Sequence, residues 1–110
     1  MSSPRLTQLL SFYEDDPNDA FVLFALAKEY ESLGQVDTAL RHYLELRDKH
    51  PDYVGLYYHL GKLYEQHGEA RTAWDTYTEG MRVARAAGDA HALSELAGAR
   101  LQLGEEEDFE

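Results

Sequence analysis

Apolar residues recur at helical spacing along most of the chain. Leu23, Leu26, Ala27 and Tyr30 follow the i, i+3, i+4, i+7 pattern of an amphipathic helix. Gly34 comes directly after this stretch, at the place where many helices end in a left-handed residue. The pattern therefore predicts a helix that ends just before Gly34.

A second amphipathic stretch follows the glycine and carries Ala39, Leu40 and Tyr43 on its apolar side. The two stretches together predict a helix hairpin. Small residues at Ala27 and Ala39 allow the two helices to approach closely, while the tyrosines fill the space toward the next hairpin. These side chains are therefore expected to pack rather than to do chemistry.

The hairpin pattern occurs twice, with a period of 34 residues. This interval separates the following pairs of like residues: Pro17 and Pro51, Leu26 and Leu60, Lys28 and Lys62, Tyr30 and Tyr64, Gly34 and Gly68, Ala39 and Ala73, Tyr43 and Tyr77. Gly61 stands where the first hairpin has Ala27, so the small residue is kept. So many coincidences at one interval indicate an internal repeat.

The first residues of the chain look like the second half of a preceding hairpin. Ser3 before Pro4 is a helix-start signal, which predicts a helix over residues 4–16 that ends before Pro17. The apolar side of this helix is expected to be formed by Leu6, Leu9, Leu10, Phe12 and Tyr13.

The last residues look like the first helix of a further hairpin. Asp89 is expected to cap a helix over residues 89–103, which Gly104 stops. The apolar side of this helix is expected to be formed by Leu93, Leu96, Ala97 and Leu101. The preceding helix is expected to run longer than its counterpart, because Arg85 stands where the repeat predicts a proline. Residues 105–110 are expected to form a solvated acidic tail.

This pattern resembles the tetratricopeptide repeat, a helix–turn–helix unit of 34 residues. The residues that carry the resemblance are Leu26, Ala27, Tyr30, Gly34, Ala39, Tyr43 and Pro51 in the first unit, and Leu60, Gly61, Tyr64, Gly68, Ala73 and Tyr77 in the second. The resemblance implies an all-α fold of about six helices, in which antiparallel hairpins stack as a right-handed superhelix. Full repeats are expected over residues 20–53 and 54–87, within a single domain over residues 1–104.

The resemblance also implies a non-catalytic protein-binding module, because the first helices of such repeats line a concave groove that commonly holds a peptide or helix of a partner. The residues expected to face this groove are Phe21, Phe24, Lys28, Tyr58, His59, Lys62 and His91. Aromatic rings beside lysines suit an acidic or aromatic segment. The family's carboxylate clamp needs asparagines on successive first helices, and the single asparagine, Asn18, lies in a predicted turn.

Other interpretations of the same residues stay open. The lysines could simply form i, i+3 pairs with glutamates on solvated helices, each contributing about 0.2–0.5 kcal/mol. Two full repeats are fewer than the roughly three usually needed for stability, which suits a self-assembling structural module. A small acidic secretion-type chaperone would also resemble such repeats.

Charge and composition limit the kinds of molecule that the chain is expected to bind. The chain has 21 acidic and 10 basic residues, a net charge of −11, so nucleic acid and anionic membranes are poor ligands for it. It has no cysteine, which removes disulfides and thiolate chemistry. With no export signal or long apolar stretch, a cytoplasmic monomer or weak homodimer is expected. The acidity suits both ordinary solubility and a salt-rich cytoplasm.

The sequence holds no pattern typical of catalysis or of metal binding. The histidines, His42, His50, His59, His67 and His91, form no i, i+4 pair with a third ligand nearby. Glycine-rich phosphate loops and nucleophile elbows are also missing from the sequence. We therefore expect no enzymatic activity, no metal and no cofactor.

Overall fold

The computed structural model describes residues 3–109, in which the chain forms six α-helices and one short 3-10 helix, with no strand among the described residues. The elements are α1 (Pro4–Asp15), α2 (Ala20–Ser32), α3 (Val36–Lys49), α4 (Gly55–Gln66), α5 (Ala70–Ala87), α6 (Ala90–Leu103) and η1 (Glu106–Phe109). The predicted all-α class with about six helices is confirmed. The chain divides into two compact units, with the boundary after Tyr53.

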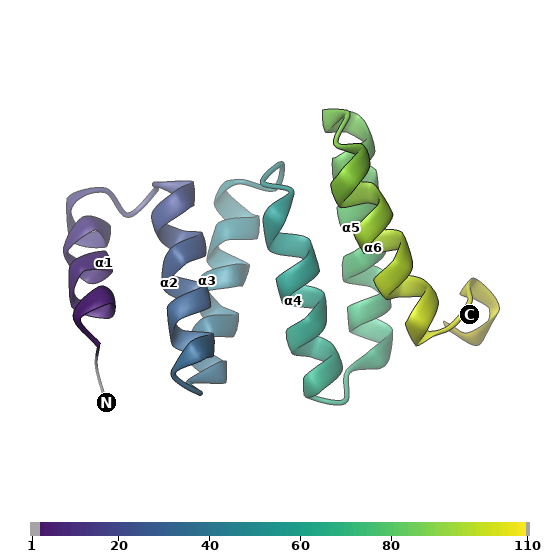
Figure 1. Ribbon diagram of the computed structural model, residues 1–110, viewed down its shortest axis with the longest axis horizontal. Helices are drawn as coiled ribbons and strands as arrows, with labels where there is room; N and C mark the ends of the chain where they lie inside the picture. The colour runs from purple at the N-terminus through teal and green to yellow at the C-terminus, as the bar shows by residue number, and fades with distance from the viewer. Residues whose placement is uncertain (1–2, 110) are drawn as a thin grey trace. The chain divides into compact units, whose positions relative to one another are not determined.

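In unit 1, α2 and α3 form an antiparallel hairpin, and α1 lies beside α2 (Figure 1). Local signals set these helices: the Ser3 hydroxyl accepts from the Leu6 amide at 3.0 Å and starts α1, and the Asp19 carboxylate accepts from the Val22 amide at 3.2 Å and starts α2. Gly34 has φ +77°, so it takes the left-handed conformation predicted for the turn between α2 and α3.

The core of unit 1 lies between α2 and α3. Its fully buried side chains are Leu23, Leu26, Ala27, Ala39, Tyr43 and Leu46. Leu6 and Leu9 attach α1 to Val22 and Leu26 of α2. Burial of an aliphatic side chain of this size contributes about 1.5–3 kcal/mol, so these contacts hold α1 in place.

The predicted apolar side of α1 is wrong in part. Leu10 is 37% exposed and Phe12 47% exposed, although both are predicted to lie on the apolar side of the helix. Helix α1 packs mainly on α2 and meets α3 through Tyr13, whose hydroxyl donates to Glu45 at 3.0 Å, so the stripe that contains Leu6, Leu9 and Tyr13 is covered while Leu10 and Phe12 are not.

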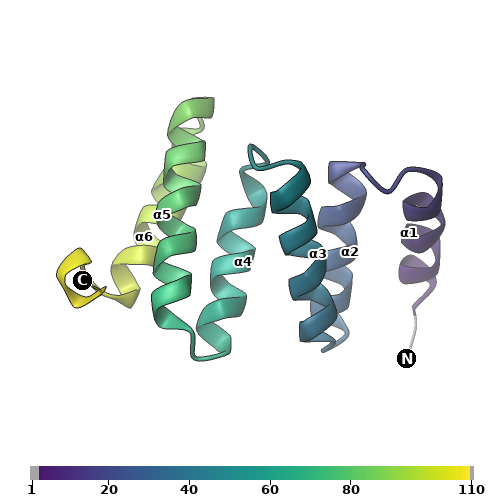
Figure 2. The same ribbon diagram turned by 180° about the vertical axis from the view of Figure 1, so that it is seen from behind.

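In unit 2, α4 and α5 form the second hairpin, and α6 packs against both of them (Figure 2). Gly68 has φ +75° in the turn between α4 and α5, as predicted. Helix α5 has 18 residues against 14 in α3, which confirms that it runs on past the missing proline. The Asp89 carboxylate then accepts from the Ala92 amide at 3.0 Å and caps α6.

Two glycines allow the helices of unit 2 to pack closely. The Tyr77 ring lies against the α-carbon of Gly61 so tightly that a β-carbon there would overlap it. A β-carbon built on Gly80 would lie 2.5 Å from Cβ of Tyr57 and 3.1 Å from Cδ1 of Leu96. The lack of a side chain at Gly80 therefore lets α4, α5 and α6 meet at one point.

The predicted apolar side of α6 is also wrong at one position. Leu96 and Ala99 are buried, but Leu101 is 66% exposed. Leu101 follows Leu96 by five residues, which is about 140° around a helix, so it cannot share the buried side. Beyond α6, Glu105 to Asp108 are exposed as expected for an acidic tail, but η1 brings Phe109 back onto Trp74.

Candidate functional site

Three of the residues predicted to face a groove lie together in unit 1. Phe21, Phe24 and Lys28 of α2 line a pocket of about 290 Å³, together with Arg5 of α1 and Glu29. We call this the α2 pocket. Phe21 is 65% exposed, an unusual position for a large aromatic side chain in a folded chain.

Charges around the α2 pocket are arranged unevenly. The Lys28 ammonium lies 5.9 Å from the centre of the Phe24 ring, within the range of a cation–π interaction. No carboxylate of the described residues pairs with Lys28 at salt-bridge distance. Glu29, in contrast, accepts from the Ser3 hydroxyl at 2.9 Å and lies 3.4 Å from Nε of Arg5. The lysine is thus left as the cation available to a ligand.

Two tyrosine rings of unit 1 pack against the Phe24 ring. Its ring centre is 5.3 Å from that of Tyr53 and 6.3 Å from that of the fully buried Tyr43. Such tilted pairs contribute about 0.5–1.5 kcal/mol beyond their buried area. Phe24 is therefore held in place without a ligand.

Unit 2 repeats this arrangement on α4. The Lys62 ammonium lies 5.5 Å from the centre of the Tyr58 ring, and Tyr58 lies 6.5 Å from the ring of Tyr77. His59 meets the Tyr58 ring edge-on at 5.6 Å. Unlike Lys28, Lys62 has a carboxylate neighbour, with its Nζ 3.5 Å from Glu65. The i, i+3 pair expected from the sequence therefore forms at Lys62, while Lys28 lies against a ring.

A buried tyrosine fixes the glutamate in both units. The Tyr43 hydroxyl donates to the Glu31 carboxylate at 2.9 Å, and the Tyr77 hydroxyl donates to Glu65 in the same way. Burial, together with the bond to the carboxylate, raises the pKa of Tyr43 and of Tyr77 well above that of a free tyrosine. Both hydroxyls therefore stay protonated and keep donating at neutral pH.

The last predicted groove residue, His91, lies apart from the others. It is on α6, its side chain is 86% exposed, and its Nε2 is 3.7 Å from the Glu95 carboxylate. The described contacts do not join it to Tyr58, His59 or Lys62. The structure thus brings the predicted residues together on α2 and on α4 but leaves His91 as an exposed residue of a helix surface.

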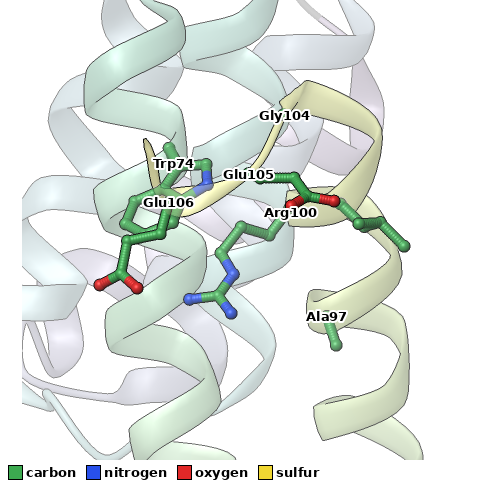
Figure 3. Close-up of a pocket in the computed structure, with 7 residues that line it drawn as sticks. Trp74, Ala97, Arg100, Gly104, Glu105 and Glu106 are labelled. Carbon is green, nitrogen blue, oxygen red and sulfur yellow. The ribbon is translucent and has the colours of Figure 1, made fainter. Parts of the chain in front are cut away.

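Unit 2 contains a pocket that the sequence did not predict. Its volume is about 280 Å³, and it lies between α5, α6 and the segment after α6 (Figure 3). Its lining residues are Trp74, Ala97, Arg100, Leu101, Gly104, Glu105 and Glu106. We call it the Trp74 pocket. The single tryptophan of the chain was the available signal.

A larger and more acidic hollow lies beside the α2 pocket in unit 1. It measures about 470 Å³, and its apolar residues include the exposed Phe12 and Phe21. Asp15, Asp16 and Asp19 form its acidic part. The two hollows share Arg5 and Phe21, so the exposed aromatic surface of unit 1 extends from α2 to α1.

Two other kinds of site are absent from the described part of the chain. Between residues 3 and 109, no three His, Asp or Glu side chains come close enough to hold a metal ion. None of the described helices combines the length and the apolar character needed to cross a bilayer.

Comparison with known proteins identifies the class to which this fold belongs. The tetratricopeptide repeat family profile matches residues 20–63. A solution NMR structure of a tetratricopeptide repeat domain protein from Salinibacter ruber is 46% identical, covers 80% of this chain and 89% of its own, and has a TM-score of 0.77. A crystal structure of such a domain from the same organism, also 46% identical, covers 77% and 96%, with a TM-score of 0.75.

A third solved structure, a protein from Bordetella parapertussis, is 25% identical, covers 94% of this chain and 89% of its own, and has a TM-score of 0.79. No curated protein sequence matches the chain. The chain belongs to the tetratricopeptide repeat family. Members of this family are in general non-catalytic modules for protein–protein interaction.

Proposed function

We propose that the chain binds a peptide or helix of a partner protein through the aromatic–lysine pairs on the first helix of each repeat, Phe24 with Lys28 on α2 and Tyr58 with Lys62 on α4. The observation that carries this proposal is the repetition of the pair: the lysine lies 5.9 Å from one ring centre and 5.5 Å from the other. Packing alone requires a large side chain but not a cation beside it.

The chemistry of the pairs favours an acidic segment that also carries an apolar or aromatic residue. The chain has only three lysines and a net charge of −11, so the Lys28 and Lys62 ammonium groups are local exceptions in a negative molecule. A ligand carboxylate can pair with Lys28 while an apolar side chain covers Phe21 and Phe24 in the α2 pocket. A basic segment would gain the acidic surface but meet these two cations.

Titration followed by amide chemical shifts tests the proposal. The probes are two sets of 12-residue peptides with the same aromatic residues, one set rich in Asp and Glu and the other rich in Lys. We expect shifts from the acidic set at Phe24, Lys28, Tyr58 and Lys62. Lys28→Glu and Lys62→Glu should each weaken binding about tenfold, as expected when an attractive charge becomes repulsive.

Arg82→Glu is the matched control. Arg82 is exposed on α5, the second helix of its repeat, and its reversal changes the net charge by the same amount. If it weakened binding as much as Lys28→Glu, the effect would come from overall charge and not from the pairs. Shifts that avoid α2 and α4 would overturn the proposal.

Self-assembly is a second candidate, favoured by the exposed apolar residues of α1. Leu10 is 37% exposed and Phe12 47% exposed, and Phe12 lines the acidic hollow with Phe21. A second copy could cover this surface. Sedimentation over a hundredfold range of concentration tests the idea, because association should weaken in Phe12→Ala, whereas a monomer throughout would argue against it.

A further inference from the structure

The segment after α6 forms one wall of the Trp74 pocket, and its aromatic residue packs on the tryptophan itself. Phe109 stacks on the indole of Trp74, with ring centres 5.5 Å apart and planes inclined by 27°. Glu105 and Glu106 line the same pocket. The chain thus places an aromatic residue preceded by acidic residues against its only tryptophan.

This segment is held to the rest of unit 2 by few interactions. The amide of Glu105 donates to the Asp108 carboxylate at 2.8 Å, and the amide of Asp108 donates to the carbonyl of Glu105 at 2.9 Å. Among the described residues, the hydrogen bonds of residues 105–109 stay within the segment. One ring stack therefore accounts for its attachment, and a competing ligand has little to displace.

One buried polar group of Trp74, a residue that lines the pocket, is not satisfied by the segment. Trp74 is only 9% exposed, yet its indole N–H has no acceptor among the described residues. Buried donors of this kind are rare in folded proteins and suit a site that a ligand completes. A carboxylate or carbonyl oxygen of a ligand would supply the missing acceptor.

Arg100 adds a cation to the same place. Its guanidinium lies 4.8 Å from the Trp74 ring centre, and Nη1 donates to the Thr78 hydroxyl at 3.0 Å. In Figure 3 this side chain extends from α6 toward α5. No carboxylate of the described part of the chain forms a salt bridge with it. The exposed Leu101 lines the pocket beside Arg100 and offers apolar surface that Phe109 leaves open.

We propose that the Trp74 pocket, together with the face of the indole that Phe109 covers, is a second binding site for partner segments in which an aromatic residue follows acidic ones, and that residues 105–109 compete with such segments within the chain. The site lies on α5 and α6, so it is independent of the aromatic–lysine pairs on α2 and α4. The ring of the partner stacks on Trp74 and its carboxylates face Arg100.

The tether sets how strongly the chain's own segment competes. A short flexible linker gives a tethered ligand an effective concentration in the millimolar range. One ring stack corresponds to roughly a tenfold gain in binding. A partner that adds contacts to Arg100 and Leu101 therefore displaces the segment, whereas a free peptide with the segment's own sequence competes poorly until Phe109 is removed.

Fluorescence of the single tryptophan tests the proposal in the full chain. Phe109→Ala should shift the emission of Trp74 to longer wavelength and increase its quenching by acrylamide. Adding the peptide acetyl-EEEDF to this variant should reverse both changes in a saturable way. The same peptide should bind the unmodified chain about tenfold more weakly, because Phe109 competes with it.

Matched controls separate this site from other effects. Phe12→Ala removes an exposed aromatic residue of unit 1 and should leave Trp74 emission unchanged. The peptide acetyl-EEEDA should bind Phe109→Ala about tenfold more weakly than acetyl-EEEDF. Arg100→Gln, combined with Phe109→Ala, should weaken binding of acetyl-EEEDF and make it less sensitive to salt. Circular dichroism establishes that each variant is folded.

Three results would overturn the proposal. Trp74 emission and quenching that are unchanged by Phe109→Ala would show that the segment does not cover Trp74. An exposed Trp74 that acetyl-EEEDF does not protect at millimolar concentration would show that the pocket does not bind such segments. Self-association of the unmodified chain that is lost in Phe109→Ala would show that the segment is exchanged between copies instead.

Discussion

The two repeats share a helix hairpin but differ in how the space beside its second helix is filled. At the equivalent position of the second helix, repeat 1 has Leu46, which is fully buried, and repeat 2 has Gly80. In repeat 1 a side chain fills the space, whereas in repeat 2 Tyr57 and Leu96 come close to the backbone of α5. The repeat pattern thus fixes where helices pack, while the residue at each position fixes how closely.

A second difference concerns a polar position that is half-buried in repeat 1 and buried in repeat 2. His42 of α3 corresponds to Thr76 of α5, 34 residues further on. The His42 ring stacks on Tyr30 at 5.4 Å and meets Tyr13 edge-on at 5.8 Å. Thr76 instead donates to the Thr72 carbonyl of its own helix at 2.8 Å. A titratable group therefore packs between two tyrosine rings in unit 1, and an uncharged hydroxyl takes its place in unit 2.

Leu46→Ala is expected to have the largest effect. Removing a fully buried leucine side chain leaves a cavity and should lower the free energy of unfolding of unit 1 by about 3 kcal/mol. Native-state hydrogen exchange measures this in α2 and α3 directly. A loss well under 1 kcal/mol would mean that the surrounding side chains collapse into the space, and that Leu46 does not fill it as described.

Gly80→Ala is expected to destabilise unit 2 for the opposite reason. The new methyl would lie 2.5 Å from Cβ of Tyr57, which is next to the backbone and cannot turn away. Overpacking of this kind costs about 1–3 kcal/mol, of which better helix propensity returns up to about 1 kcal/mol. We expect a net loss of about 1–2 kcal/mol in urea unfolding followed by Trp74 fluorescence.

Gly98→Ala is the control for this variant. Gly98 is a glycine of α6 with nothing within 4 Å of a built β-carbon. There the propensity gain acts alone and should stabilise unit 2 by about 0.5–1 kcal/mol. Equal effects at both glycines would contradict the close approach of α4, α5 and α6 at Gly80.

Much of this architecture could be predicted from the sequence, because it rests on local signals. The caps at Ser3 and Asp89 and the left-handed turns at Gly34 and Gly68 follow from neighbouring residues alone. The aromatic–lysine pairs are also local, since Lys28 follows Phe24 at the i+4 position of one helix.

What the sequence could not predict depends on contacts between distant segments. Arg5 reaches the α2 pocket from α1, and the 34-residue period does not predict this contact. Phe109 meets Trp74 across 35 positions of the chain, and its acidic neighbours predict only a solvated tail. Whether Leu101 is buried likewise depends on which helices surround α6. Periodicity identifies an apolar side but not how much of it another element covers.

Tyr43→Phe and Tyr77→Phe should have nearly equal effects, because the bond from tyrosine to glutamate is the same in both repeats. Each variant loses one hydrogen bond to a carboxylate, and we expect a loss of about 1 kcal/mol in urea unfolding at pH 7. A loss of stability in only one of the two variants would show that the tyrosine has a different role in each repeat.

These tyrosines also predict an alkaline limit. Burial and the glutamate bonds raise both pKa values, so the neutral hydroxyl is favoured in the folded state. Their contribution is fully present below the ordinary tyrosine pKa of 10.0 and is lost as pH rises above it, because the unfolded chain releases the proton first. Stability measured from pH 9 upward should fall less steeply in the two phenylalanine variants.

The smallest expected effect is a loss of stability in mild acid that occurs in unit 1 and not in unit 2. Burial lowers the pKa of His42 from its ordinary 6.5, against the opposing influence of Glu45, whose carboxylate lies 3.4 Å from Nδ1. The unfolded chain then takes up the proton first, so stability is lost as pH falls below about 6.5. Hydrogen exchange between about pH 7.5 and pH 5.5 should show this loss in α2 and α3.

His42→Thr gives repeat 1 the residue of repeat 2 and is the matched variant for this experiment. It should remove the pH dependence of unit 1 whatever it does to stability at pH 7.5, because a threonine carries no titrating proton in this range. Helices α4 and α5, with Thr76 at the equivalent position, should serve as an internal reference in both proteins. If unit 1 of His42→Thr still lost stability on acidification, the proton would be taken up elsewhere, and the difference between the two cores would lie in their packing alone.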